Sequence, residues 1–308
     1  MADEIIYSGI GDLTLAAALS AEYILLAADR NALPNHPALQ YVGDISVGAH
    51  SAVIKCPHVG LMGYALLAST GDGTSVANTA LTDGSTSVTV GRYSKAYEAS
   101  DLAKMTAGAG GLSAQVFAMD AMVSGALTLT SLVANLMDNF TTVVGSTGVD
   151  MTVANFLDAI TALEVANAQG PLLTVLHSQQ FGDFRKDLGI NSGGAVQFAP
   201  ASAEMIKVSG GGLVGSFAGV DIVVSNYVPD MNGGLDRGGG MFAKGAILWA
   251  DGSVGSDGSP DQMVIGGKVL FERDRTARSG LTAYVSHRYL GVAEGIDGFG
   301  VTIQTDAT

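Results

Sequence analysis

The chain has 308 residues, one cysteine and a formal net charge of −14, from 29 acidic and 15 basic residues. A single cysteine cannot form an intramolecular disulfide, which excludes a small disulfide-stapled scaffold. Hydrophobic residues reach 47%, whereas charged residues reach only 14%, against a usual share of roughly 25%. This composition excludes a disordered chain. So few charges also indicate that partners cover much of the surface.

The acidic balance disfavours two kinds of partner. A protein that grips nucleic acid by its phosphates needs clustered lysine and arginine, and anionic membranes repel an acidic surface for the same reason. The start, Met1 to Glu4, is acidic where a secretory signal would be basic. The most apolar stretch, 13–28, is shorter than the roughly 20 residues that a bilayer demands. We therefore expect a chain made in the cytoplasm, with no membrane partner.

The first hundred residues predict a helix, an arm and a hairpin. Helical spacing over 13–30 follows a possible N-cap at Asp12, and an extended arm runs over 31–55. This helix is either peripheral or an ordinary N-terminal helix. A polar stretch, 70–86, then separates an apolar run at 61–68 from a strand that starts at Ser87. We interpret this as a hairpin with a long polar tip, held by a partner or free as a surface loop.

Residues 112–138 give the clearest single element. Its polar side chains fall on one narrow stripe of a helix wound at 100° per residue: Ser113, Asp120, Ser124, Ser131, Asn135 and Asp138. Apolar residues occupy the rest of the circumference. The pattern predicts a long helix that is buried on most sides.

From Gly148 onward, helices and strands alternate. The expected elements are a helix opened by a capping signal at Asp150, a strand over 171–176, a helix over 177–188, strands over 205–208 and 220–224 around a turn at 209–212, a glycine-rich loop over 230–240, a strand over 241–250, a loop over 251–261, long β structure over 268–293 and a last strand over 299–304. No repeat of 20–50 residues is present, which excludes solenoids and propellers.

Two glycine- or aspartate-rich patterns carry little chemistry. Gly210 to Gly215 fits G-x-G-x-x-G, but a dinucleotide site needs a helix there, and a strand pattern follows instead. We expect a hairpin turn. Asp257 to Asp261 resembles part of a calcium loop, but Lys268 stands where the closing glutamate belongs. We expect a solvated loop.

No enzyme motif is present. The five histidines lie far apart, and Cys56 with His58 supplies only two of the four ligands of a structural zinc. The chain has no G-x-S-x-G, P-loop or H-E-x-x-H sequence. We therefore predict no catalytic, cofactor-binding or metal-binding residues, and no cofactor.

The segment 271–278 is an unusual strand. Period-2 geometry places Glu272 and Asp274 on one face and Arg273 and Arg275 on the other. Such a strand suits pairing with charges of neighbouring molecules on both sides. The alternative is an exposed edge strand protected by its charge.

Taken in order, these elements resemble the major capsid proteins of tailed bacteriophages, with the α+β Hong Kong 97 capsid fold. Three segments carry the local similarity: Val90 to Asp101, which leads into a spine helix; Leu176 to Phe184, which looks like the axial-domain helix; and Leu213 to Pro229, similar to the hairpin that leads to the capsomer centre. The resemblance implies an N-terminal arm (1–50), an E-loop hairpin (51–98), a peripheral domain with the spine helix (99–148), an axial domain (149–261) and peripheral-domain strands (262–308).

This resemblance also implies a function. The chain would be a non-enzymatic subunit that assembles with itself into hexamers and pentamers of an icosahedral head, which encloses double-stranded DNA without binding it specifically. Expected partners are scaffolding, portal and decoration proteins, and the expected location is the virion. An encapsulin-like compartment shell is the alternative on the same fold, and a cytosolic α+β enzyme is the alternative of another class.

The family's arrangement points to candidate contact residues. The hairpin of one subunit reaches a neighbour's peripheral domain, so we expect contacts between subunits at Arg92, Lys95, Glu272, Arg273, Asp274, Arg275 and Arg278. The E-loop tip would present Asp72, Asn78 and Asp83. Cross-linked members of the family place a lysine in this loop, and the tip at 70–86 contains none. We therefore expect no covalent cross-link there.

Overall fold

The computed structural model describes residues 33, 36–45, 51–59, 72, 83–106, 114–168, 170–190, 198–200, 213–252, 261–265 and 268–306. The helices are α3 (Asp101–Thr106), α5 (Ala114–Ala134), α6 (Val153–Val165) and α7 (Ser178–Ile190), with 3-10 turns η3 (Asn232–Gly234) and η4 (Asp297–Phe299). The predicted helix at 13–30, the strand at 205–208 and most of the hairpin tip lie outside the described residues.

The first sheet has six strands and is built on one long strand, β15 (Leu281–Glu294). The others are β1 (Gln40–Ile45), β4 (Gly91–Ser100), β12 (Ile247–Gly252), β13 (Gln262–Ile265) and β14 (Val269–Thr276). β14 and β4 both pair with residues 281–288 of β15, so they occupy opposite edges. β12 pairs with the rest of β15, sharing residues 289 and 290 with β4. β12 and β14 therefore lie end to end along one edge of β15.

The second sheet has eight strands in the order β5-β16-β11-β6-β9-β8-β7, with β10 paired to β11. Their bounds are β5 (Val143–Gly145), β6 (Leu172–Leu176), β7 (Phe198–Pro200), β8 (Leu213–Phe217), β9 (Val220–Val224), β10 (Asp230–Met231), β11 (Asp236–Ala243) and β16 (Gly300–Asp306). Phe156 of α6 and Phe184 of α7 pack edge-on against Phe217 of β8, with ring centroids 5.5 and 5.3 Å away. β2 (Val53–Val59) and β3 (Asp83–Thr89) form a separate antiparallel hairpin.

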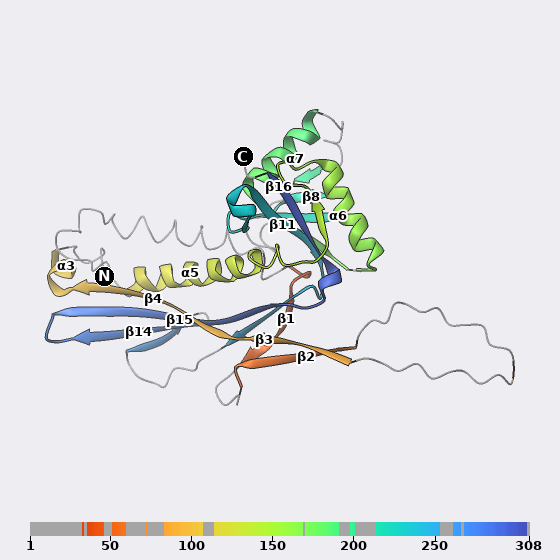
Figure 1. Cartoon of the computed structure of the whole chain (residues 1–308). Coiled ribbons are helices and arrows are strands. Elements are labelled where there is room, and N and C mark those ends of the chain that lie inside the picture. Colours follow the sequence, from red (N-terminus) through yellow and green to blue (C-terminus); the bar gives the residue numbers. More distant parts are fainter. Residues whose placement is uncertain are drawn as a thin grey trace.

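α5 lies along the six-stranded sheet, beside β4, β15 and β14 (Figure 1). Phe117 of this helix stacks between Tyr97 and Tyr284, with both centroid distances 5.0 Å. The prediction of a long helix is confirmed, but the helix ends at Ala134 rather than at 138. The chain tightens there, because the amides of Leu136 and Met137 donate to carbonyls three residues back.

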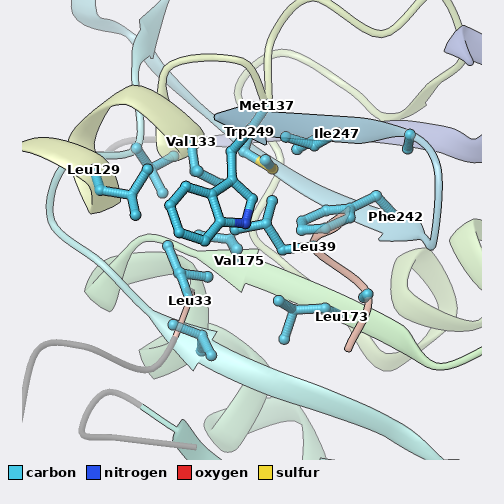
Figure 2. Close-up of a cluster of buried hydrophobic side chains, with 14 of the residues drawn as sticks. Leu33, Leu39, Leu129, Val133, Met137, Leu173, Val175, Phe242, Ile247 and Trp249 are labelled. Carbon is cyan, nitrogen blue, oxygen red and sulfur yellow. The ribbon is translucent and has the colours of Figure 1, made fainter. Parts of the chain in front are cut away.

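The main core lies where the C-terminal half of α5 meets both sheets. Leu33, Leu129 and Val133 surround the indole of Trp249, which comes from the six-stranded sheet (Figure 2). Phe242, from the eight-stranded sheet, is fully buried in the same cluster. These side chains join the two sheets and the helix into one unit.

The prediction of a glycine-rich loop over 230–240 is wrong at 236–240, because residues 236–243 form strand β11. Glycines 238–240 are required there by close neighbours and not by a turn. A Cβ on Gly239 would meet Oε1 of Gln180 at 2.6 Å and the carbonyl oxygen of Val175 at 3.1 Å. A Cβ on Gly240 would meet the sulfur of Met137 at 2.8 Å.

One further expectation for this region is wrong. The strand expected over 241–250 is two strands in different sheets, broken by a turn at Gly245, whose φ is +97°. The hairpin that leads into β9 turns at Ala218 and Gly219, whose φ angles are both positive, as a two-residue type I′ turn demands. The turn expected at 209–212 lies outside the described residues. The last three residues of the Gly210 to Gly215 pattern belong to strand β8. This pattern is therefore no dinucleotide-binding loop, which would have to open a helix.

The other described elements agree with the sequence. The strands expected at 171–176, 220–224 and 299–304, the helix at 177–188 and the β structure at 268–293 are confirmed. The helix expected from Asp150 starts at Val153, with Thr152 as its N-cap. β12, from the proposed axial segment 149–261, joins the six-stranded sheet, and β16, from 262–308, joins the eight-stranded one. The two sheets thus exchange strands across residue 261.

The start of α7 is fixed by a reciprocal cap. The Gln179 amide donates to Nδ1 of His177, and the His177 amide donates to Oε1 of Gln180. The Gln180 side-chain amide also donates to the carbonyl oxygens of Arg237 and Ile303, both at 3.1 Å. One buried glutamine therefore ties α7 to β11 and β16.

Substitution of two glycines tests this packing. We expect Gly239→Ala to destabilise the protein by about 1–3 kcal/mol, because the methyl group enters the space of Gln180 and of a backbone carbonyl. Gly182→Ala is the matched control. It lies within α7 with no atom near its Cβ, so it should stabilise by about 0.5–1 kcal/mol. Denaturant unfolding of both variants measures the difference, and equal effects would contradict the explanation.

The His177 cap predicts a pH dependence. Burial, and then the charge of Arg237, lower the pKa of His177 below its usual 6.5. The unfolded chain therefore takes up this proton more readily than the folded one, and stability is lost as the pH falls below about 6.5. Asparagine can cap a helix without titrating. We expect melting temperatures of His177→Asn to depend less on pH than those of the wild type between pH 8 and 5; parallel curves would be the contrary result.

Candidate subunit-contact surface

The charged segment predicted from the sequence lies at an exposed end of the six-stranded sheet. β13 pairs with β14 only as far as Glu272, and the Arg273 amide donates to the carbonyl of Asp261. Beyond it, β14 has a strand partner only on the β15 side among the described residues. Arg273, Asp274 and Arg275 are all exposed there. In a single chain this is a charged edge strand, which resists unspecific pairing.

Two of these arginines form ion pairs within the chain. The Nε atom of Arg273 lies 3.4 Å from Oδ1 of Asp261, and an Arg275 guanidinium nitrogen lies 2.8 Å from Oδ2 of Asp101. All four side chains are about half exposed. Such pairs contribute about 0.2–1 kcal/mol each, so they stay open to competition from a neighbouring molecule.

Glu272 and Lys95 also have partners within the chain. Glu272 accepts a hydrogen bond from Nε2 of Gln262 at 2.7 Å, and its other oxygen lies 3.3 Å from Nε2 of His287. The Lys95 ammonium lies 2.6 Å from Oδ2 of Asp120 on α5, and so holds β4 to the helix.

The side chains of three predicted contact residues form no ion pair or hydrogen bond with the described residues. Arg92 is exposed on β4 opposite Tyr289. Asp274 is exposed on β14, and Arg278 in the turn that follows. Among the predicted contact residues, these three side chains are without a polar partner in the part of the chain that the structure describes.

The hairpin tip is described only at its margins. Asp72 is exposed, and Asp83 is the first residue of β3, paired with Val59. Asn78 lies outside the described residues.

The described residues offer little to a cofactor or metal. They contain no group of three or more histidine, cysteine, aspartate and glutamate side chains placed to hold a metal ion. Burial raises the pKa of the Cys56 thiol, which disfavours its reactive thiolate. Among the described helices, none is long and apolar enough to cross a membrane.

The sequence analysis missed a charge cluster around a buried carboxylate where β12 meets β14. Asp251 is 1% exposed; the Lys268 ammonium lies 2.7 Å from its Oδ2, and an Arg288 guanidinium nitrogen lies 3.8 Å from the same atom. Neither Asp251 oxygen accepts a well-aligned hydrogen bond from the described residues. Burial lowers the pKa of Arg288, opposed by the Asp251 charge. No spacing in the sequence signals this cluster, because strand pairing alone brings the three residues together.

The fold is that of known shell proteins. The chain is similar to the capsid protein of the cyanophage P-SCSP1u (13% identity, TM-score 0.59, 88% of this chain and 86% of that chain). It is also similar to the capsid protein of Ralstonia phage GP4 (10%, 0.62, 88% and 87%) and to the SrpI encapsulin of Synechococcus elongatus PCC 7942 (13%, 0.60, 88% and 86%). No family model and no curated protein sequence matches the chain. These similarities confirm the predicted α+β capsid fold.

Proposed function

We propose that this chain is the major capsid protein of a tailed phage, a structural subunit with no catalytic step of its own. Copies assemble into hexamers and pentamers of a closed icosahedral head that encloses double-stranded DNA. The observation that carries the proposal is the similarity over 88% of the chain to two phage capsid structures. The virion is then its location, after synthesis in the host cytoplasm.

The shape and charge of the chain support this role. A hairpin beside the sheet, a long helix along that sheet and a separate eight-stranded sheet leave several faces without a partner among the described residues (Figure 1). A net charge of −14 repels packaged duplex, so that DNA is enclosed without adhering to the wall.

We further propose the division of the chain into an arm (1–50), an E-loop (51–98), a peripheral domain (99–148 and 262–308) and an axial domain (149–261). Scaffolding, portal and decoration proteins are its proposed accessory partners. The encapsulin similarity favours a second candidate, a protein-filled bacterial compartment, at equal chain coverage.

Assembly is the decisive test. We expect the purified protein, alone or with a scaffold, to form closed shells by electron microscopy and light scattering. Particles isolated from producing cells should hold nuclease-protected DNA for a phage head, whereas a protein cargo would identify a compartment. Only monomers to dimers under all these conditions would overturn both forms of the proposal.

The free charges refine the contact between subunits. We infer that Arg92 of one subunit pairs with Asp274 of another, because both side chains are exposed and have no polar partner among the described residues, whereas Glu272 is engaged by Gln262 and His287. One exposed pair contributes about 0.2–1 kcal/mol, and a shell repeats it many times.

A double-mutant cycle tests this pair. We expect Arg92→Ala and Asp274→Ala each to lower shell yield and shell melting temperature, and the double variant to be no worse than either. Arg275→Ala with Asp101→Ala is the matched control, since that pair lies within one chain and should couple in the stability of the unassembled subunit. Strictly additive effects of Arg92 and Asp274 would show that the two charges face water.

A further inference from the structure

Four polar side chains form a row across the six-stranded sheet. The hydroxyl oxygen of Ser94 on β4 lies 2.6 Å from Nδ1 of His287 on β15. Nε2 of the same imidazole lies 3.3 Å from Oε2 of Glu272 on β14. The other oxygen of this carboxylate accepts a hydrogen bond of 2.7 Å from Nε2 of Gln262 on β13. A serine, a histidine and a carboxylate are thereby linked in order, and the carboxylate is itself held in place.

The register of the strands puts this row on one face of the sheet. Ser94 pairs directly with His287, and Glu272 pairs with Val285, two residues away on β15. Side chains two residues apart on a strand share a face, so all three polar side chains point the same way. Tyr284, which stacks against α5, is three residues from His287 and points to the other face. Ser94 is exposed, so its hydroxyl group is open to reagents in solution.

The carboxylate decides which imidazole nitrogen carries the proton. An ionised carboxylate only accepts hydrogen bonds, so Nε2 of His287 is the protonated nitrogen in the neutral ring. Nδ1 is then a base, and it accepts the hydrogen bond from the Ser94 hydroxyl. A serine that donates to a base, which a third group orients, is the arrangement that activates a serine as a nucleophile.

A cation stands beside this serine. Arg92 precedes Ser94 by two residues on β4, so both side chains share a face and their Cα atoms lie about 7 Å apart. The Arg92 side chain is exposed and has no polar partner among the described residues. Its guanidinium group can stabilise the negative charge that develops on a carbonyl oxygen when Ser94 attacks. In the proposed shell this group pairs with Asp274 instead, so the arrangement belongs to the unassembled subunit.

We propose that Ser94 is an activated nucleophile and a site of covalent acylation in the unassembled subunit, with activated carboxylic esters as the reacting class. Oγ of Ser94 forms a bond to the acyl carbon, and the bond between that carbon and the leaving oxygen breaks. The Ser94 proton passes to Nδ1 of His287 and from there to the leaving oxygen. The product is an acyl ester of Ser94, formed once per chain.

Site-resolved acetylation tests the reactivity of Ser94. The unassembled subunit is treated with p-nitrophenyl acetate and quenched with acid, and acetylation of each residue is measured by mass spectrometry. Ser178 is the matched control in the same molecule: it is exposed and donates to Oδ1 of Asn226 at the same 2.6 Å, but an amide oxygen is no base. We expect Ser94 to react about 100-fold faster than Ser178, because a positioned general base assists only Ser94. Equal rates would overturn the proposal.

Two variants separate the base from the residue that positions it. His287→Gln keeps a polar side chain but removes the base, so Ser94 should then react no faster than Ser178. Glu272 acts only through His287, and its effect is read by nitrogen-15 NMR of the neutral imidazole. We expect a protonated Nε2 and a bare Nδ1 in the wild type. Both tautomers should appear in Glu272→Gln, because an amide both donates and accepts.

Unchanged acetylation of Ser94 in His287→Gln, or a protonated Nδ1 in the wild type, would overturn the proposal. If a variant does not fold, the comparison of Ser94 with Ser178 in the wild type decides. The reaction is measured on the subunit before assembly, so its outcome is independent of whether shells form and of what they enclose.

Discussion

β15 is hydrogen-bonded along both edges, and the placement of most other elements depends on it. Because β4 occupies one edge, β12 and β14 must share the other, end to end. α5 then packs across β4, β14 and β15. At its far end β15 reaches β12, whose Trp249 lies in the core shared with the eight-stranded sheet. One strand of 14 residues thereby connects the charged tip of the sheet to the junction of both sheets.

The shared edge has a physical cost at the point where β12 ends and β14 begins. Backbone pairing changes partner there, and Asp251 is buried beside Lys268 and Arg288. Removal of a charge from water costs several kcal/mol unless it is paired. Two cations around one carboxylate offset that cost, and they attach the start of β14 and the middle of β15 to β12. The cluster thus fixes the relative position of two strands that share no ladder with each other.

Local patterns predicted most elements, and tertiary contacts explain the failures. The polar stripe with Asp120 predicted α5, because helical spacing is visible in sequence alone. Gly239 misled the prediction, since a glycine run is typical of loops, whereas here the glycines admit Gln180 and Met137 against β11. The alternating charges of 272–275 identified an exposed strand. Which of them are free could not be predicted, because that depends on the register that places Gln262 and His287 beside Glu272.

The distribution of charge also decides what can hold copies of the chain together. At least seven of the 15 lysines and arginines already pair within the chain: Lys95, Lys186, Arg237, Lys268, Arg273, Arg275 and Arg288. An exposed pair contributes about 0.2–1 kcal/mol, whereas full burial of one large aliphatic side chain contributes about 1.5–3 kcal/mol. Val165, Met105 and Leu235 are each more than 65% exposed in the single chain. In the proposed shell, apolar burial therefore supplies most of the affinity between subunits, and free charges such as Arg92 set their register.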